Sequence, residues 1–534
     1  MGKNVIGIRA LFPYKKDGDG MDYDFIIIGS GFGGSVSALR LIDKGYRVLL
    51  LEKGRRLQAA DFPKTNWDLK RWLWLPRLGF RGLFKLTFLP DLTIVSGVGL
   101  GGGSLVYANT LPIPGEDFFQ AASWAQLADW KDELAPHYQT ARRMLGATPT
   151  PHLTYPDEII KEVAHELGRA EHFHPTEVAV YFGEPGQTAP DPFFQGKGPA
   201  RTGCVYCGGC MLGCQHNAKN TLDKNYLYLA EQQGLHVETD TEVTAVRALE
   251  DQRYRIEAKQ HGQAKVFTAH NVVFAGGVLG TVPLLLKMKA DPNGLPRLSE
   301  RLGEFVRTNS ESIIAVISEQ RDRDLSKGIA IGSILHTDEH SHLEPVRYSA
   351  GSGFWRLLSA PHVSGDSIVM RCANLLRLIV RHPLKVLKAY LVPDYAKYTM
   401  ILLYMRTLEG TLRLKLKRGA LTTTRGSGKP ATANIPEADE LAERIATKIN
   451  GLPTSIATES LLGIPTTAHV LGGCCMGETA QDGVIDHRHR VFGYEGLFVI
   501  DGAAVSANPG VNPSLTITAL AERAISLLPT KSSS

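Results

Sequence analysis

The sequence predicts an α/β protein with a Rossmann-like lobe and a second, α+β lobe built on a mixed sheet. Residues 24–54 show a buried strand, a glycine-rich turn, a helix and a second strand in direct succession. A further strand with a glycine-bearing turn follows at 272–280, and a glycine-rich apolar block fills 469–521. Because long excursions separate these three blocks, we expect the Rossmann-like lobe to be discontinuous in the sequence.

The first block carries glycines in the spacing G-x-G-x-x-G. Gly29 permits the tight turn after the strand, Gly31 lets a pyrophosphate approach the backbone, and Gly34 allows helix and strand to pack closely. The free N–H groups at the helix N-terminus favour phosphate binding. Glu52 ends the next strand, where a carboxylate can accept hydrogen bonds from ribose hydroxyls. The block therefore predicts a dinucleotide site but does not choose between NAD and FAD.

Composition excludes several classes of protein. Hydrophobic residues make up 43% and charged residues 21% of the chain, as is typical of a globular protein. The net charge of +5 gives no support to a nucleic-acid partner, and no apolar run is long enough to span a membrane. Residues 1–21 lack the apolar core and cleavage site of a signal peptide, so we interpret them as an N-terminal extension.

A second glycine-rich segment, residues 95–110, interleaves its glycines with apolar residues. Such density is typical of backbone that lies flat against a planar ligand, where a side chain would clash. A flexible linker fits poorly because apolar residues alternate with the glycines. The candidate contacts in this loop are Gly97, Gly101 and Gly102, with polar groups from Ser104, Tyr107 and Asn109.

Two stretches, 69–90 and 369–393, combine apolar and basic residues without any acid. One interpretation is a surface that contacts a membrane or covers an apolar substrate. The alternative is a lid whose aromatic rings face the core while its basic groups face water. For the first stretch we favour the lid, because Pro76 and Pro90 interrupt any long amphipathic helix.

The C-terminal blocks resemble a known family. His469 followed by Leu-Gly-Gly, the Asp501-Gly502 pair and the segment GVNPSLTITALAER, together with the two glycine-rich regions, resemble the glucose–methanol–choline (GMC) oxidoreductases, nearest to the bacterial cholesterol oxidase branch. The resemblance implies an FAD enzyme that oxidises an alcohol. It implies non-covalent FAD, because the histidine used for covalent attachment in this family is missing from the 95–110 loop. The cofactor contacts that it implies are Val243, Ala275, Gly276, Asp501, Gly502, Asn512 and Pro513, beside those given above.

His469 and Asn512 are the predicted catalytic residues. Oxidation of an alcohol requires a base for the hydroxyl proton, and imidazole suits that task near neutral pH. A neutral amide such as that of Asn512 can hold the substrate oxygen without competing for the proton. Without the resemblance, a core histidine would be the simpler interpretation of His469. The cholesterol oxidase branch also uses a glutamate to shift a steroid double bond. Tyr398 stands near that position, so we do not expect isomerase activity.

Four of the seven cysteines are crowded into one short segment. Their spacing, C-x2-C-x2-C-x3-C, is typical of an iron–sulfur ligand run, although four thiolates can equally hold zinc. An iron–sulfur cluster would indicate a dehydrogenase that uses an acceptor other than oxygen, whereas zinc leaves an oxidase open. Clustered free thiols also favour a reducing compartment, the cytoplasm. Cys474 and Cys475 are interpreted as small buried residues. The predicted metal ligands are Cys204, Cys207, Cys210 and Cys214.

Together these observations predict an FAD-dependent oxidoreductase acting on a lipophilic alcohol, sterol-like or long-chain, with oxygen or another compound as electron acceptor. The protein is expected in the cytoplasm with peripheral contact to a membrane; no oligomeric state is predicted. Two alternatives are an iron–sulfur FAD dehydrogenase of a polar alcohol or sugar, and a non-catalytic flavin- or lipid-binding protein. The FAD-binding domain is assigned to 22–60, 91–110, 217–312 and 466–530, and the substrate-binding domain to 61–90, 111–216 and 313–465.

Overall fold

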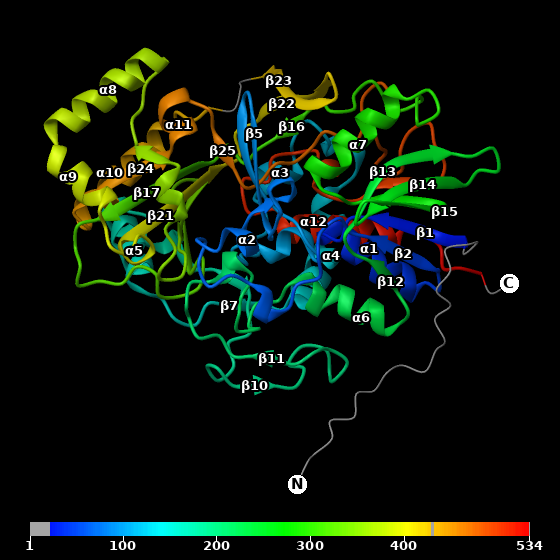
Figure 1. Ribbon diagram of the computed structural model, residues 1–534, viewed down its shortest axis with the longest axis horizontal. Coiled ribbons are helices and arrows are strands. Elements are labelled where there is room, and N and C mark those ends of the chain that lie inside the picture. The colour runs from blue at the N-terminus through cyan, green and yellow to red at the C-terminus, as the bar shows by residue number, and fades with distance from the viewer. Residues whose placement is uncertain (1–21, 429–431, 533–534) are drawn as a thin grey trace, which may run out of the picture.

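The computed structural model describes residues 22–428 and 432–532, and its first large sheet combines parallel and antiparallel strands (Figure 1). Strand β1 is flanked in parallel by β2 and β15, and β12 and β26 extend this parallel part. An antiparallel meander of β13, β14 and β15 completes the sheet. The strands are β1 (Asp22–Ile28), β2 (Val48–Leu51), β12 (His236–Glu238), β13 (Thr241–Ala248), β14 (Tyr254–Gln260), β15 (Gln263–Phe274) and β26 (Leu497–Val499).

The core of this lobe forms because its strands are apolar on both faces. Ile26 and Ile27 are fully buried, as are Leu49 and Leu50 on the neighbouring strand. Helix α12, near the C-terminal end of the chain, packs against α1 and α4, which both come from the first third of the chain. The predicted discontinuous Rossmann-like lobe is thus confirmed. Its helices are α1 (Phe32–Asp43), α4 (Trp130–Leu145), α6 (Tyr226–Gln232), α7 (Val278–Ala290) and α12 (Ser514–Ser526).

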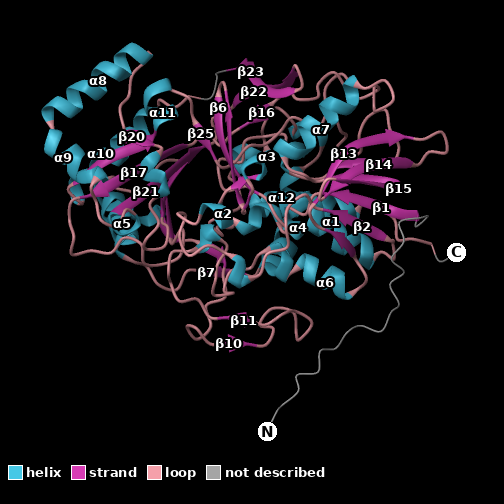
Figure 2. Cartoon of the chain, in the orientation of Figure 1, coloured by secondary structure: helices cyan, strands magenta, loops and turns pink. Residues whose placement is uncertain are grey.

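The second large sheet lies at the opposite side of the view from the first (Figure 2). Between them lies the hairpin of β5 (Phe84–Leu89) and β6 (Leu92–Gly97). We expected a mixed sheet here, but each described strand pair in it is antiparallel. The mixed sheet is the one in the Rossmann-like lobe. The strand order is β20 (Ser359–Pro361), β24 (Gly451–Ile456), β17 (Ser312–Ser318), β21 (Thr399–Arg406), β19 (Ser341–Val346), β18 (Ser333–His336) and β8 (Phe173–Pro175).

Side-chain alternation gives the second sheet two different faces. Ile314, Leu343 and Leu402 point to one face and pack with helices α5 (Tyr155–Glu166) and α10 (Pro436–Lys448). The residues one position along, among them Ile313 and Leu403, point to the other face and line a cavity. The sheet therefore separates a helix-covered core from the cavity described below.

Shorter elements close the molecule around these two sheets. Trp72 and Phe84 are buried in one aromatic cluster, so the predicted lid of residues 69–90 does turn aromatic rings inward, whereas Phe88 is 58% exposed. The remaining helices and strands are α2 (Leu69–Trp72), β3 (Trp74–Leu75), β4 (Phe80–Arg81), β5 (Phe84–Leu89), β6 (Leu92–Gly97), α3 (Glu116–Phe119), β7 (Ala147–Pro149), β9 (Glu177–Ala179), β10 (Thr188–Ala189), β11 (Arg201–Thr202), β16 (Val306–Arg307), α8 (Ile368–Arg381), α9 (Pro383–Tyr390), β22 (Gly410–Lys417), β23 (Ala420–Gly428), α11 (Ala457–Leu462) and β25 (Thr466–Thr467).

Candidate active site

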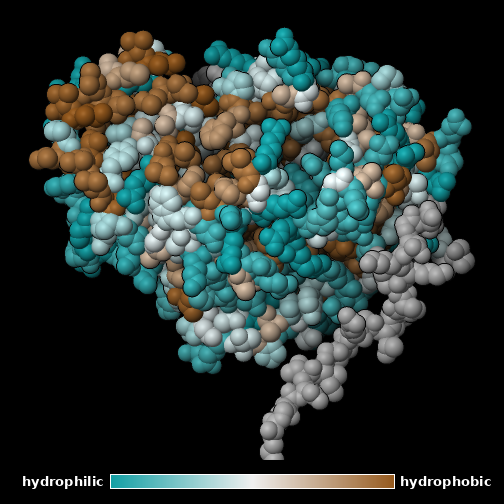
Figure 3. Space-filling model, viewed as in Figure 1, coloured by the Kyte–Doolittle hydropathy of each residue, from teal (hydrophilic) through white to brown (hydrophobic). Residues whose placement is uncertain are grey.

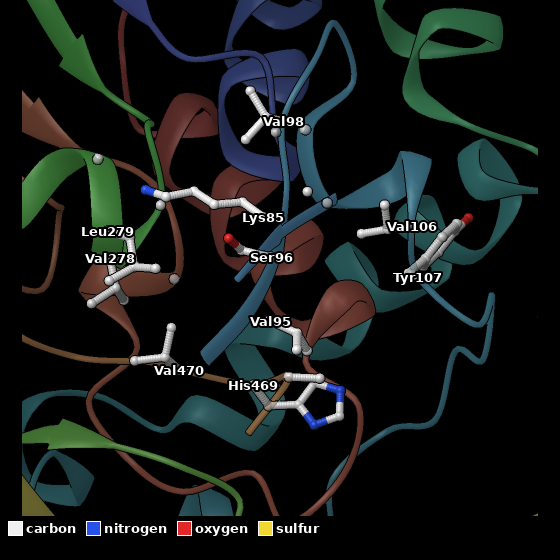
Figure 4. Close-up of a pocket in the computed structure, with 18 of the residues that line it drawn as sticks. Lys85, Val95, Ser96, Val98, Val106, Tyr107, Val278, Leu279, His469 and Val470 are labelled. Atoms are coloured by element: carbon white, nitrogen blue, oxygen red, sulfur yellow. The ribbon is translucent and has the colours of Figure 1, made fainter. Parts of the chain in front are cut away.

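A cavity of about 910 Å³ runs between the two large sheets, from the glycine turn after β1 to His469. Figure 4 shows the His469 ring near Val95, with Lys85 and Val98 further along the same cavity. The wall is mostly apolar at the His469 end, and polar and charged groups gather near the glycine turn. Such a combination of apolar wall and few convergent polar groups is typical of a small-molecule site.

The glycine turn is shaped by close backbone contacts. A Cβ atom on Gly33 would lie 1.7 Å from the Ile500 carbonyl oxygen, and one on Gly34 would lie 2.0 Å from the Gly29 carbonyl oxygen. Gly29 itself has a φ of 103°, which favours glycine. In contrast, a Cβ on Gly31 would meet no atom nearer than 4.0 Å, because the cavity opens there. The helix N-terminus at Gly31 therefore faces open space, as an anion site requires.

Glu52 lies on the cavity wall next to this turn. Its carboxylate accepts hydrogen bonds from the Ser30 hydroxyl at 2.6 Å, the Ser30 amide at 3.1 Å and the Gly54 amide at 2.8 Å. The carboxylate thus ties the end of β2 to the turn after β1. Its contact with a ribose stays a prediction. Sequence reasoning missed two lysines on the same wall, Lys53 and Lys85; burial, and then the charge of Lys53, lower the pKa of Lys85 to about 8.

The second glycine-rich loop crosses the cavity beside the turn. Gly102 approaches Gly31 so closely that an added Cβ would lie 2.7 Å from the Gly31 Cα. Tyr107 donates from its hydroxyl to the Asn220 carbonyl oxygen at 2.8 Å, and Asn109 is buried with a φ of 73°. Ser104 serves the loop itself, since its hydroxyl donates to the Gly101 carbonyl and accepts from the Leu222 amide.

The start of α12 and the residues before it form another part of the wall. Asp501 accepts from the amides of Gly277 and Ala503, each at 2.7 Å, and from the Thr281 hydroxyl at 2.6 Å. Burial raises the pKa of Asp501 to about 6. Asn512 and Pro513 stand directly before α12, so the positive end of the helix dipole faces the cavity. The cavity wall at the start of α12 therefore favours a negatively charged group.

His469 is held by a carboxylate that sequence reasoning did not find. Its Nδ1 lies 2.9 Å from Glu311 Oε2, and the Glu311 side chain is 1% exposed. Glu311 also accepts from the Thr467 hydroxyl and from the Ala468 amide at 2.9 Å. Because a carboxylate is a hydrogen-bond acceptor, Nδ1 carries the proton and Nε2 keeps a free lone pair. The pair therefore has the arrangement of a general base with its orienting group.

Asn512 contacts a second buried carboxylate. Its Nδ2 donates to Glu344 Oε2 at 3.4 Å, whereas Asn512 Oδ1 and Glu344 Oε1 have no hydrogen-bond partner among the described residues. Burial, and then the charge of Glu311, raise the pKa of Glu344 to about 8. Tyr398, which the sequence analysis placed near the glutamate position of the cholesterol oxidase branch, does not line the cavity. The glutamate that the fold brings beside Asn512 is Glu344.

The structure brings most predicted cofactor contacts to one cavity and leaves three behind it. Gly34, Gly101 and Ser104 lie off the wall, in the packing that supports the turn and the loop. The catalytic roles of His469 and Asn512 stay predictions. The predicted residues on the wall are Gly29, Gly31, Glu52, Gly97, Gly102, Tyr107, Asn109, Val243, Ala275, Gly276, His469, Asp501, Gly502, Asn512 and Pro513.

The structure gives no support to the predicted metal centre at the cysteine cluster. No group of three or more His, Cys, Asp or Glu side chains is arranged to hold a metal ion within residues 22–428 and 432–532. Cys204, Cys210 and Cys214 instead join a small apolar cluster with Val178, Ile329 and Ala330. Burial, reinforced by the neighbouring thiols, raises the pKa of Cys204 and raises that of Cys210 to about 11. We therefore do not propose iron–sulfur or zinc at Cys204, Cys207, Cys210 and Cys214.

The fold and the cavity define a two-lobed oxidoreductase with a dinucleotide cofactor. Residues 200–302 and 430–521 match the family description GMC oxidoreductase, and residues 27–70 match the description NAD(P)-binding Rossmann-like domain. A cholesterol oxidase from Mycobacterium tuberculosis (strain ATCC 25618 / H37Rv) is 46% identical, over 96% of this chain and 92% of that protein. A cholesterol oxidase from Acinetobacter baumannii is 42% identical, over 96% of this chain and 95% of that protein. The chain belongs to the GMC oxidoreductase family.

A solved structure supports the fold separately. The crystal structure of pyridoxine 4-oxidase from Mesorbium loti superposes with a TM-score of 0.62, covering 95% of this chain and 99% of that chain at 15% identity. At this identity the likeness concerns the fold alone. FAD is the cofactor of the family, and the cavity fits it. Open space faces Gly31, and the glycine loop lines the cavity beside it. At the other end, the buried Asn512 Oδ1 has no hydrogen-bond partner among the described residues.

Proposed function

We propose that this protein oxidises the CH–OH group of a sterol-like or other lipophilic alcohol, with His469 as the base. The observation that carries the proposal is the Glu311–His469 pair at the apolar end of the cavity. The cholesterol oxidases that match nearly the whole chain support a sterol as the substrate class. The two-domain division with the predicted boundaries, the cytoplasmic location and non-covalent binding of FAD are part of the same proposal.

Each group at this end of the cavity has a definable task. Glu311 holds Nδ1 protonated, so His469 Nε2 accepts the hydroxyl proton of the substrate. Asn512 orients the substrate oxygen through its amide. FAD, when bound, would supply the acceptor for the hydride that leaves the carbon bearing this hydroxyl group. The turn at Gly31, the loop at Gly97–Asn109 and the residues before α12 would hold it.

A helix pair provides a route to a lipid-soluble substrate. Between Asp366 and Asp394 the chain contains no acidic residue. In α8 and α9, Arg371 and Ala389 are buried, while Val369 is 79% and Val380 70% exposed. Figure 3 shows the hydrophobic surface that results over these helices, at the upper left. Further exposed apolar side chains of the patch are Ile368, Met370, Leu376, Ile379, Leu384, Leu387 and Leu391.

The charge and position of this helix pair favour a membrane surface. Arg377 and Arg381 are exposed on α8 and have no acidic neighbour in their own segment, which suits anionic lipid headgroups. Leu378 of α8 shares an apolar cluster with Trp355, and Trp355 lines the cavity. In the described residues no helix is long and apolar enough to cross a membrane. We therefore propose peripheral contact through α8 and α9.

Glu344 supports a second activity, the shift of a double bond after oxidation. A buried carboxyl whose pKa is raised to about 8 can take and return a proton near neutral pH. Its Oε1 has no hydrogen-bond partner among the described residues. From Tyr398 near the glutamate position we expected no isomerase activity, and this proposal reverses that expectation.

Substrate profiling tests the proposal. The purified holoenzyme is offered cholesterol, a long-chain primary alcohol, glucose and choline, with oxygen or an artificial dye as acceptor. We expect oxidation of the sterol, with hydrogen peroxide formed when oxygen accepts the electrons. Oxidation of glucose or choline without any sterol turnover would support the polar-alcohol alternative, and FAD binding without any turnover the non-catalytic one.

A further inference from the structure

A row of histidines leads from the edge of the second sheet towards the buried end of the cavity. His342 and Glu344 are two residues apart on β19, so both point to the cavity side of the sheet, as does Val346 on the cavity wall. His336 on β18 is the direct cross-strand partner of His342. On the edge strand β8, His174 lies opposite Ile334, which places it on the same face as His336.

The members of this row become progressively buried. His174 is exposed and His336 half-buried, whereas His342 is 2% and Glu344 0% exposed. The rings of His336 and His342 have their centroids 5.7 Å apart. His342 Nε2 lies 3.7 Å from Glu344 Oε1, a gap that one water molecule or a small rotation closes. Neither of these two atoms has another hydrogen-bond partner among the described residues.

We propose that His336, His342 and Glu344 form a proton path between solvent and the reactive end of the cavity. The path ends at Asn512, whose Nδ2 donates a hydrogen bond to Glu344 Oε2 at 3.4 Å. This inference rests on the proposed function, because oxidation of one alcohol hydroxyl frees one proton at His469. That proton later returns to an acceptor such as oxygen or is released. A lipophilic substrate would fill the apolar end of the cavity, so proton exchange needs a separate polar route.

Burial keeps the inner members of the row neutral. Burial, and then His336 and His469, lower the pKa of His342 to about 3, so its ring is neutral and has a free lone pair. Burial, and then His174, His172 and Arg169, lower the pKa of His336. The side chain that faces this pair from the cavity is Glu344, whose pKa is raised to about 8. A neutral imidazole can take a proton at one ring nitrogen while it releases the proton from the other, so a relay through His342 leaves no lasting buried charge on its ring.

The test separates proton release from oxidation. The anaerobic holoenzyme is mixed with cholesterol in weak buffer, and FAD bleaching and a pH-indicator dye are followed together. In the wild type we expect the proton to appear in solvent together with bleaching. In His342→Leu and His336→Leu we expect release to lag by about tenfold or more, with bleaching changed by less than about threefold. His340→Leu is the matched control, since His340 is exposed on the same hairpin and pairs with Asp117.

Two further measurements exclude a merely structural effect. Imidazole added to His342→Gly should restore proton release. In the absence of substrate, the infrared band of the protonated Glu344 carboxyl, assigned by its loss in Glu344→Gln, should shift in His342→Leu. Unchanged proton release in both leucine variants would overturn the path, and so would a Glu344 carboxyl band that does not shift in His342→Leu. The path would also be overturned if bleaching and proton release fell together and imidazole did not restore proton release. Absence of bleaching in the wild type would instead contradict the proposed function.

Discussion

Glu311 Oε2 lies 2.9 Å from His469 Nδ1, although 158 residues separate the two positions in the chain. Glu311 directly precedes β17 of the second large sheet, and His469 follows β25, which pairs with β6. The hydrogen bond therefore joins the edge of that sheet to the segment beside the β5–β6 hairpin. The contact selects the tautomer of His469 that leaves Nε2 able to accept a proton. It orients the histidine ring for the proposed role of a base.

Replacing His469 tests the base. We expect His469→Ala to lower kcat by about 10²- to 10⁴-fold, because the hydroxyl proton then has no positioned acceptor. The measurement is the rate of anaerobic FAD bleaching by sterol in a stopped-flow instrument. His487→Ala serves as control, since His487 is not among the residues that line the cavity. Bleaching at the wild-type rate in His469→Ala would show that another group takes the proton.

Replacing Glu311 tests the orienting contact. The amide of Glu311→Gln can donate to Nδ1, so it no longer fixes the productive tautomer. We expect kcat to fall by about 10- to 100-fold with little change in KM. Glu304→Gln is a suitable control, because Glu304 lies in a surface ion pair with Arg301. A wild-type kcat in Glu311→Gln would contradict the role of the pair.

Gly33 tests the construction of the glycine turn. A Cβ atom at this position would lie 1.7 Å from the Ile500 carbonyl oxygen, so helix α1 or β26 must shift. We expect Gly33→Ala to lower stability by about 1–3 kcal/mol and to weaken FAD retention during gel filtration. Gly115→Ala is the control, because no atom lies within 4 Å of its added Cβ. Full FAD retention in Gly33→Ala would mean that the turn tolerates the displacement.

The exposed apolar side chains of α8 and α9 test the membrane contact. Val380→Glu and Leu384→Glu, two positions each 70% exposed, should lower binding to anionic phosphatidylserine vesicles by about tenfold or more. Co-sedimentation measures this, and salt should weaken binding of the wild type. Val266→Glu, at a 48% exposed position on β15, should bind as the wild type does. Equal binding by all variants would place the contact elsewhere.

The proposed double-bond shift should depend on pH through Glu344. Its pKa is raised to about 8, so the carboxylate that accepts the proton forms only as pH rises through that value. The rate of the shift should therefore increase up to about pH 8 and then level off. Absorbance of the conjugated ketone follows the shift, with the unshifted ketone as substrate. Glu344→Gln should lose this step while still oxidising the alcohol; a shift that persists in Glu344→Gln would assign the reaction to another group.

Much of the site can be predicted because its parts are local in the sequence. The spacing of Gly29, Gly31 and Gly34 between strand and helix predicts the turn, and the apolar strands around it predict the lobe. The C-terminal block identifies the family that the comparisons confirm. These features depend on steric rules for neighbouring residues, which a sequence displays directly.

The sequence by itself thus determined the Rossmann-like lobe, the glycine contacts and His469 as the candidate base. Only the tertiary structure decided which carboxylates meet His469 and Asn512, that the second sheet is antiparallel, and that the four crowded cysteines do not converge on a metal. The physical reason is that these relationships depend on strand register and chain path. The pairing of β18 with β19 places His336 opposite His342, and no local spacing encodes that pairing.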